Sequence, residues 1–582
     1  MRAVIASLRS SRTCLRCSLQ PANRAHLYRP TVDTGHASRS LRRPLSGTGV
    51  EHHRQLHSHF HEPTIYALST ASGKAAIAVI RISGPACAQI YEGLCPSAAF
   101  PKPRRATLRK LYSPHQPPSP ATLLDSGALV LYFPSPNTAT GEDLLELHVH
   151  GGPAIVRAVL AAIPQCTTLS EASPSHPIRY AEPGEFTRRA FANNRMDLPQ
   201  IESLGETLSA STEQQRQISV RGTTSSLAVR YEQWRMLLLA ARGELEALID
   251  FSEDQHFDES PAQLCASVAD QVRVLRAQME AHIANAVRGE LLRNGISMAL
   301  LGAPNAGKSS LLNRIVGREA AIVSQEAGTT RDIVEVSVDL GGWLVKIGDM
   351  AGLRRAGLVG AELVGAVEQE GIKRAKQRAL ESDVLVVVQD ATAEMDPEVT
   401  ETAKQCVSSG INVVVAVNKI DQLSSTPGAE DAWKANIHST LGLPSSQISF
   451  ISCVPASPHT KDPGNIQSFL ATLTRTFRAM TAALVPDSDP SPHIWQESLG
   501  ATERQRILLE ECQAHLDAFL AAVTPELTEE HSAYGIEPDA ADDIDIVLAA
   551  ESLRSAAEAL ARITGKGEGG DVEEVLGVVF EK

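Results

Sequence analysis

The stretch GAPNAGKS, residues 302–309, reads G-x-x-x-x-G-K-S and decides the fold of the middle of the chain. It follows the apolar residues 297–301 and precedes a helix-like run at 310–316, an order typical of a buried strand, a phosphate-binding loop and a helix. Backbone N–H groups of such a loop can bind the α- and β-phosphates, while Lys308 reaches the β/γ-phosphates and Ser309 ligates Mg²⁺. The sequence therefore predicts a nucleotide site.

Four further segments follow in the order that a GTPase needs. GTTRD (328–332) supplies a threonine for a loop that senses the γ-phosphate, and DMAG (349–352) follows a predicted strand at 343–347. NKID (418–421) ends the apolar strand 413–417, and the Asp421 carboxylate can accept hydrogen bonds from guanine N1–H and the 2-amino group. Ser452 stands where the last guanine-contacting loop belongs. Adenine lacks that donor pair, so the motifs predict GTP.

Leu353 follows the glycine of the second switch, where Ras-type enzymes carry a glutamine that orients the attacking water. An aliphatic side chain cannot orient water, so hydrolysis needs another carboxylate or a cation. The amide oxygen of Asn305 is suited to hold a monovalent cation beside the phosphates. Such a cation would neutralise charge in the transition state as an arginine finger does.

Two blocks before the GTPase motifs are more distinctive: GEDLLELHVHGG (141–152) and PGEFTRRAF (183–191). With the opening segments PTIYA (63–67) and IRISG (80–84), they make the chain resemble the MnmE/TrmE family of tRNA modification GTPases, in a mitochondrial version. The resemblance covers nearly everything from about residue 63 to residue 582.

The resemblance implies a specific function. Members act with an FAD-dependent MnmG-like partner to install an aminomethyl-type group on C5 of the wobble uridine of certain tRNAs. A methylene-tetrahydrofolate supplies the carbon, and GTP hydrolysis drives a conformational cycle. The family also implies a homodimer through the N-terminal domain, with contact between the two G domains during hydrolysis, and a location in the mitochondrial matrix.

The resemblance also assigns roles to individual positions. Glu368 matches the catalytic glutamate, which would orient water in place of the missing glutamine. Arg81, Glu146 and Arg195 match folate-contacting positions. Asn305, Ser324, Glu326 and Thr329 match K⁺ ligands, and Ser309 with Thr330 match Mg²⁺ ligands. The predicted GTP-binding residues are Asn305, Ala306, Gly307, Lys308, Ser309, Ser310, Thr329, Thr330, Asp349, Gly352, Asn418, Lys419, Asp421 and Ser452.

Three features depart from the family. Relatives have several glycines around Gly73, where this chain has GKAAIA (73–78), so the backbone there approaches a folate less closely. Met350 stands where the family has threonine, which predicts slower switching at most. Relatives end in F-C-x-G-K, whereas this chain stops at Lys582 without that cysteine. We expect GTPase activity to survive, with transfer of the one-carbon unit in question.

The predicted fold is multidomain, α/β plus all-α. We expect a transit peptide and linker at 1–60, an α/β folate-binding and dimerisation domain at 61–195, and a helical domain in two parts, 196–294 and 481–582. A Ras-like P-loop G domain, 295–480, is inserted between those parts. Strands are expected at 76–82, 126–133 and 144–149, and helical periodicity in the flanking regions.

Composition agrees with this organisation. The first 50 residues hold nine arginines and one acidic residue, as in an organellar transit peptide. A net charge of −14 argues against non-specific coating of nucleic acid, and nine scattered cysteines suggest reduced thiols. No apolar run is long enough for a membrane span. His148 and His150 alternate on one strand face, where a structural pair is favoured over a metal pair.

Two other functions remain open at this point. An Era-like ribosome-assembly GTPase shares the N-A-G-K-S loop, but no RNA-binding KH signature is apparent and the two N-terminal blocks have no role there. A scaffold that binds GTP and its partner without modifying tRNA is supported mainly by the shortened C-terminal tail.

Overall fold

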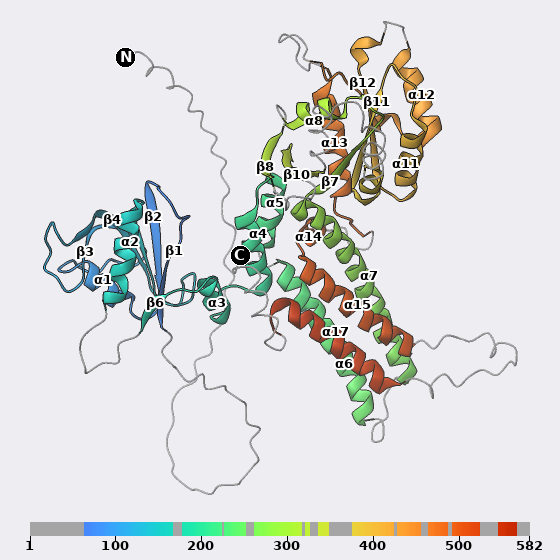
Figure 1. Ribbon diagram of the computed structural model, residues 1–582. Helices are drawn as coiled ribbons and strands as arrows, with labels where there is room; N and C mark the ends of the chain where they lie inside the picture. The colour runs from blue at the N-terminus through green and yellow to red at the C-terminus, as the bar shows by residue number, and fades with distance from the viewer. Residues whose placement is uncertain are drawn as a thin grey trace, which may run out of the picture. The chain divides into compact units, whose positions relative to one another are not determined.

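The computed structural model describes residues 63–166, 177–223, 226–251, 261–316, 320–325, 336–348, 375–423, 428–454, 464–486, 492–523 and 545–566. Figure 1 shows these segments and labels their helices and strands where there is room. The leader predicted at 1–60 and the two switch loops, within 326–335 and 349–374, lie outside the described residues.

The N-terminal region is built on a six-stranded sheet in the order β3-β4-β5-β2-β1-β6. Its neighbouring strands are antiparallel except for β1 and β6. The three predicted strands are present, although β4 begins three residues earlier than expected, and β1, β3 and β6 were not predicted. The strands are β1 (Thr64–Leu68), β2 (Ile77–Ser83), β3 (Thr107–Tyr112), β4 (Leu123–Phe133), β5 (Leu144–His150) and β6 (Ile178–Tyr180).

Two helices cover one face of this sheet. Residues 80 and 82 of β2 and residues 145, 147 and 149 of β5 are buried in a core with α1 (Cys87–Leu94) and α2 (Pro153–Ala162). Because side chains alternate along a strand, residues 81, 146, 148 and 150 point to the opposite face. A 3₁₀ turn, η1 (Ile163–Cys166), follows α2, and α3 (Glu185–Ala192) contains most of the PGEFTRRAF block.

The GTPase region has a seven-stranded sheet in the order β13-β12-β11-β7-β10-β9-β8. The strands from β13 to β10 are parallel, while β9 and β8 are antiparallel to their neighbours. Six of the seven residues of β11 are buried, as expected for a parallel strand with helices on both faces. The strands are β7 (Ile296–Leu301), β8 (Ala321–Gln325), β9 (Val336–Leu340), β10 (Trp343–Ile347), β11 (Val384–Asp390), β12 (Asn412–Asn418) and β13 (Ile448–Phe450).

Helices follow the parallel strands in the usual α/β manner. The apolar face of the last long helix of this region packs into the same core as β7 and β10. The helical elements are α8 (Lys308–Arg314), α11 (Pro397–Ser408), η3 (Ile420–Gln422), α12 (Ala429–Leu441), η4 (Ser445–Gln447) and α13 (Ile466–Met480).

The remaining helices form one domain from two separate parts of the chain. A single hydrophobic core combines residues 227–279 with residues 508–563. The GTPase region therefore is inserted into the helical domain, as predicted. The helices are α4 (Leu198–Ser209), α5 (Glu213–Gly222), α6 (Ser226–Phe251), α7 (Pro261–Asn294), α14 (Pro492–Ser498), α15 (Glu503–Val523) and α17 (Ile546–Thr564).

A chain of buried polar groups also joins these helices. His282 Nε2 lies 3.0 Å from the Tyr231 hydroxyl, which donates to Gln505 Oε1 at 3.2 Å. Gln505 donates in turn to the Glu202 carboxylate, and Arg504 binds the same carboxylate at 2.7 Å. Hydrogen bonds as well as apolar packing therefore connect helices from both sides of the insertion.

We predict that His282 makes the helical domain sensitive to acid. Complete burial lowers the pKa of His282 to about 3 from 6.5. Between these two pKa values the unfolded chain binds a proton at His282 and the folded chain does not. The free energy of unfolding therefore has its full value above pH 6.5 and decreases as the pH falls below it. The expected slope is about 1.4 kcal/mol per pH unit.

The measurement is urea unfolding between pH 7.5 and 5, followed by tryptophan fluorescence. A His282→Gln variant keeps a donor for Tyr231 but cannot titrate, so its stability should fall less steeply with acid. Equal slopes for the two proteins would show that His282 is not the sensitive group.

Candidate functional site

The predicted phosphate loop lies between β7 and α8. Gly307 has a φ of +100°, and a Cβ atom on it would lie 2.1 Å from the side-chain nitrogen of Asn418. Glycine is therefore required there both by the backbone and by the space. Asn305 also has a positive φ, of 61°, which asparagine tolerates better than most residues. The G-x-x-x-x-G-K-S pattern thus forms a tight turn at the carboxyl end of a parallel strand.

Lys308 bends back over this loop. Its Nζ donates to the carbonyl oxygens of Gly302 at 2.7 Å and Ala303 at 2.9 Å. Burial lowers the pKa of the ammonium group. The lysine lies at the first turn of α8, where the helix dipole and free backbone N–H groups favour an anion. This arrangement suits a nucleotide phosphate.

Asn418 connects the phosphate loop to the loop after β13. Its side chain is buried, donates to the Ala306 carbonyl at 2.9 Å and accepts from the backbone N–H of Cys453 at 3.3 Å. The asparagine of the N-K-I-D motif therefore holds two other loops in place. The sequence pattern alone did not reveal this contact, because its partners are backbone atoms far away in sequence.

The rest of the base-binding segment is also positioned by side chains. Lys419 Nζ binds Asp390 at 2.6 Å, a partner that the sequence analysis missed. Ser452 Oγ donates to the Asp421 carboxylate at 2.5 Å. Asp421 and Ser452 thus lie together, and the second carboxylate oxygen accepts no hydrogen bond from the described part of the chain. A carboxylate held in this way is suited to accept hydrogen bonds from the N1–H and 2-amino groups of guanine.

The other predicted residues of this site divide into two groups. Ser309 and Ser310 lie in the first turn of α8 and are exposed, whereas Ser324 is in β8 and its side chain is not described. Six predicted positions lie outside the described residues: Glu326, Thr329, Thr330, Asp349, Gly352 and Glu368.

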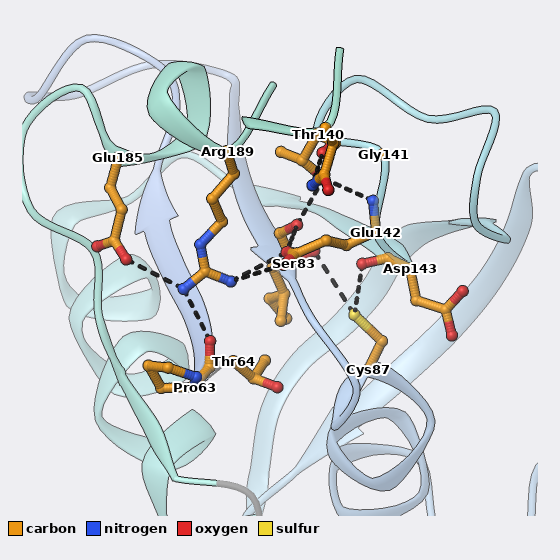
Figure 2. Close-up of polar contacts among 12 residues, drawn as sticks. Pro63, Thr64, Ser83, Cys87, Thr140, Gly141, Glu142, Asp143, Glu185 and Arg189 are labelled. Carbon is orange, nitrogen blue, oxygen red and sulfur yellow. Dashed lines mark hydrogen bonds and ion pairs between the residues drawn. The ribbon is translucent and has the colours of Figure 1, made fainter. Parts of the chain in front are cut away.

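A second cluster of polar groups connects the two distinctive N-terminal blocks (Figure 2). Arg189, 5% exposed, donates to Glu142 at 2.9 Å, to Glu185 at 3.0 Å and to the Pro63 carbonyl at 2.8 Å. Ser83 Oγ donates to the same Glu142 carboxylate at 2.7 Å. The sequence pattern alone does not reveal the role of Arg189, although this residue and its two acidic partners all stand in the quoted blocks.

The neighbouring loop, which contains Thr140 and Asp143, is also fixed by hydrogen bonds. Ser83 and Thr140 hydroxyls lie 2.6 Å apart, and the Cys87 thiol donates to the Asp143 carbonyl at 3.3 Å (Figure 2). Burial raises the pKa of the Cys87 thiol well above its usual value, so this cysteine is an unreactive structural group.

The predicted folate residues are partly assembled. Arg81 and Glu146 form an ion pair of 2.9 Å on the sheet face opposite α1 and α2. His148 Nε2 lies 3.4 Å from the same carboxylate. Arg195 instead donates to the Thr138 carbonyl at 2.9 Å, in the loop that precedes Glu142, and no described contact joins it to the Arg81 pair.

The described segments show neither a metal-binding cluster nor a membrane-spanning helix. They contain no group of three or more histidine, cysteine or acidic side chains arranged to hold a metal. No helix in them combines the length and apolar character that a membrane crossing needs.

Comparison with known proteins follows the same division of the chain. Residues 64–195 match the family model described as GTP-binding protein TrmE N-terminus, and residues 198–582 match the MnmE helical domain. The chain is 36% identical over 526 residues to tRNA modification GTPase mss1, mitochondrial, of Schizosaccharomyces pombe, covering 89% of this chain and 94% of that protein.

Two further relatives show similar coverage. Identity is 37% over 517 residues with tRNA modification GTPase MnmE of Parvibaculum lavamentivorans, covering 89% of this chain and 98% of that protein. Identity is 34% over 533 residues with 5-taurinomethyluridine-[tRNA] synthase subunit GTPB3, mitochondrial, of Danio rerio, covering 89% of this chain and 92% of that protein. The chain therefore belongs to the MnmE/TrmE family of tRNA modification GTPases.

Proposed function

We propose that this GTPase modifies C5 of the wobble uridine of mitochondrial tRNAs together with an FAD-dependent MnmG-like partner. The observation that carries the proposal is the presence in one chain of a GTP-type site and the Arg189 cluster, which joins the two N-terminal blocks of the family. A ribosome-assembly GTPase of the Era type would use the GTP-type site, but the Arg189 cluster would have no role in it. A scaffold without modification activity remains the alternative that the experiment below tests.

The GTPase cycle in this proposal uses two cations. Ser309 and Thr330 hold Mg²⁺, and Asn305, Ser324, Glu326 and Thr329 hold K⁺. Of these, the side chains of Asn305 and Ser309 are described, and both residues are exposed in or directly after the phosphate loop, where an ion could reach them. Hard cations prefer such amide, hydroxyl and carbonyl oxygens. Glu368 orients the attacking water when two G domains meet.

A tetrahydrofolate derivative is the proposed source of the carbon, held by Arg81, Glu146 and Arg195. The charges of the described residues fit this ligand. A carboxylate accepts hydrogen bonds from the amino and ring N–H groups of a pterin, and guanidinium groups bind the carboxylates of the glutamate tail. The same domain, residues 61–195, forms the homodimer in this proposal.

The proposed compartment is the mitochondrial matrix, with residues 1–60 as a transit peptide. Two of the relatives described above carry mitochondrial in their names. The proposed division of the remaining chain is 196–294 and 481–582 for the helical domain and 295–480 for the G domain.

The test is nucleoside analysis of mitochondrial tRNA from a strain in which the gene is deleted. We expect loss of the C5 modification and its return with the intact gene. Glu368→Ala should fail to restore it and should slow K⁺-stimulated GTP hydrolysis by about 100-fold or more, as expected for loss of a group that positions water. Glu381→Ala is the matched control, because Glu381 is exposed and binds Gln377. Normal tRNA in the deletion strain would refute the proposal.

A further inference from the structure

A second pair of titratable groups lies on the sheet face that carries Arg81 and Glu146. His150 Nδ1 lies 2.8 Å from Oδ1 of Asp125. The Asp125 side chain is completely buried, whereas 58% of the His150 side chain is exposed. A buried carboxylate therefore holds one ring nitrogen of a largely exposed imidazole, and the other nitrogen, Nε2, has no hydrogen bond among the described residues.

The Asp125 carboxylate is fixed in its charged form. It accepts backbone hydrogen bonds from Gly127 at 2.9 Å and from His150 at 2.8 Å. Burial raises the pKa of this carboxyl, but the hydrogen bonds and the charge of His150 outweigh burial and hold the pKa below its usual value. An ionised Asp125 accepts the proton of Nδ1, which sets the tautomer of a neutral His150 and leaves a lone pair on Nε2.

Strand register places this pair in line with the proposed folate residues. Arg81 pairs with Glu146 and Ile77 pairs with His150 across β2 and β5, so both pairs share one face. His150 lies four residue steps along the extended strand from Glu146, a span of about 13 Å. This span is similar to that of the pteridine and p-aminobenzoyl groups of a folate lying along the strand.

The surroundings leave the imidazole accessible. Gly127 lies beside the ring, and a Cβ atom there would come within 3.8 Å of the His150 ring. Ile77, opposite His150, is 60% exposed. By contrast, His148 on the same face lies against the Glu146 carboxylate at 3.4 Å, through its own Nε2. The predicted histidine pair is therefore two histidines with different partners, and His150 is the one with a free Nε2 among the contacts described.

We propose that His150 is a proton-transfer residue for the folate-borne one-carbon unit and that Asp125 is its positioning residue. This inference rests on the proposed folate site. Protonated His150 gives its Nε2 proton to the folate nitrogen from which the carbon departs. The electron pair of the broken carbon–nitrogen bond accepts that proton, and the positive charge passes to the nitrogen that keeps the carbon. The imidazole is left neutral, with its Nδ1–H on Asp125.

The first test concerns the imidazole and needs no folate. In the full chain labelled with ¹⁵N-histidine, the His150 signals are those that disappear in His150→Gln. We expect neutral His150 to carry its proton on Nδ1, and Asp125→Asn to move it to Nε2. The amide nitrogen in the Oδ1 position can donate to Nδ1 while the amide oxygen still accepts from the His150 N–H, and the Gly127 N–H then loses its acceptor. A proton on Nε2 in the unaltered protein would overturn the inference.

The second test measures transfer of label from [¹⁴C]methylene-tetrahydrofolate to tRNA with the FAD-dependent partner, and folate binding separately. His150→Gln and Asp125→Asn should slow transfer by about 100-fold or more, with folate affinity changed less than about threefold. His115→Gln, a histidine that binds the Gln165 carbonyl, is the matched control. Unchanged transfer in His150→Gln, or equal loss of binding and transfer, would overturn the proton-transfer role. Failure of the unaltered protein to bind folate would instead refute the proposed folate site together with this role.

Discussion

Replacing Asp421 by asparagine will convert the nucleotide preference of this GTPase from guanine to xanthine. The carboxylate accepts from two guanine donors in the proposed site, and hydrogen bonds to a charged group are worth roughly 1.5–3 kcal/mol each. Loss of both should weaken GTP binding by about 100-fold or more. An asparagine amide can instead donate to the extra carbonyl oxygen of xanthine.

The measurement is binding and hydrolysis of GTP and XTP by the unaltered protein and by Asp421→Asn. Asp431→Asn is a suitable control, because Asp431 is exposed on α12 and its ion pair is with Lys434. The position of Asp421 is fixed by Ser452, so Ser452→Ala should weaken GTP binding without creating affinity for XTP. If Asp421→Asn binds GTP normally, the residues after β12 do not contact the base.

Replacing Arg189 by methionine will destabilise the N-terminal domain by about 3–5 kcal/mol, the usual cost of removing one partner from a buried ion pair. The side chains of Arg189 and Glu185 are each 6% exposed. Burial alone would raise the pKa of Glu185, but hydrogen bonds from Arg179, the Glu182 backbone and Arg189 outweigh it and lower the pKa. The carboxylate stays charged, so it needs a cation.

Calorimetry of the full chain should show the transition of this domain at a lower temperature in Arg189→Met. Arg157→Met, on the exposed side of α2, is the control and should change stability by less than about 0.5 kcal/mol. Adding Glu142→Gln and Glu185→Gln to Arg189→Met should restore part of the loss, since the uncompensated charges are then removed. No recovery would mean that packing of the arginine, and not its charge, stabilises the domain.

The order of local motifs was sufficient to predict most of the fold. The parallel strands β7, β10 and β12 are short apolar runs that lead into a loop motif, and each was expected within one or two residues of its bounds. Strands β8, β9 and β11 were not predicted. Helical runs on both sides of that region predicted the insertion. These signals are local, because periodicity and glycine positions reflect the backbone of their own segment.

Less local elements were missed for a physical reason. Strands β1, β3 and β6 are short or lack clean alternation, and their identity depends on pairing with distant strands, for example Thr64 with Ile178. Some residues of the sites were missed for the same reason. The sequence pointed to Lys308, Asp421 and Arg81, but not to Arg189, Asp390 or Asp125, whose roles depend on partners far along the chain.

The sequence by itself determined the GTPase class, the family and the domain order, because each depends on residue types at fixed spacing. The tertiary structure decided which charges meet. It places Arg189 between two carboxylates and puts His148 and His150 of a single strand against different acids. Spacing along one strand gives two histidines the same face, but the pairing partner of each comes from packing and register, which a single segment does not encode.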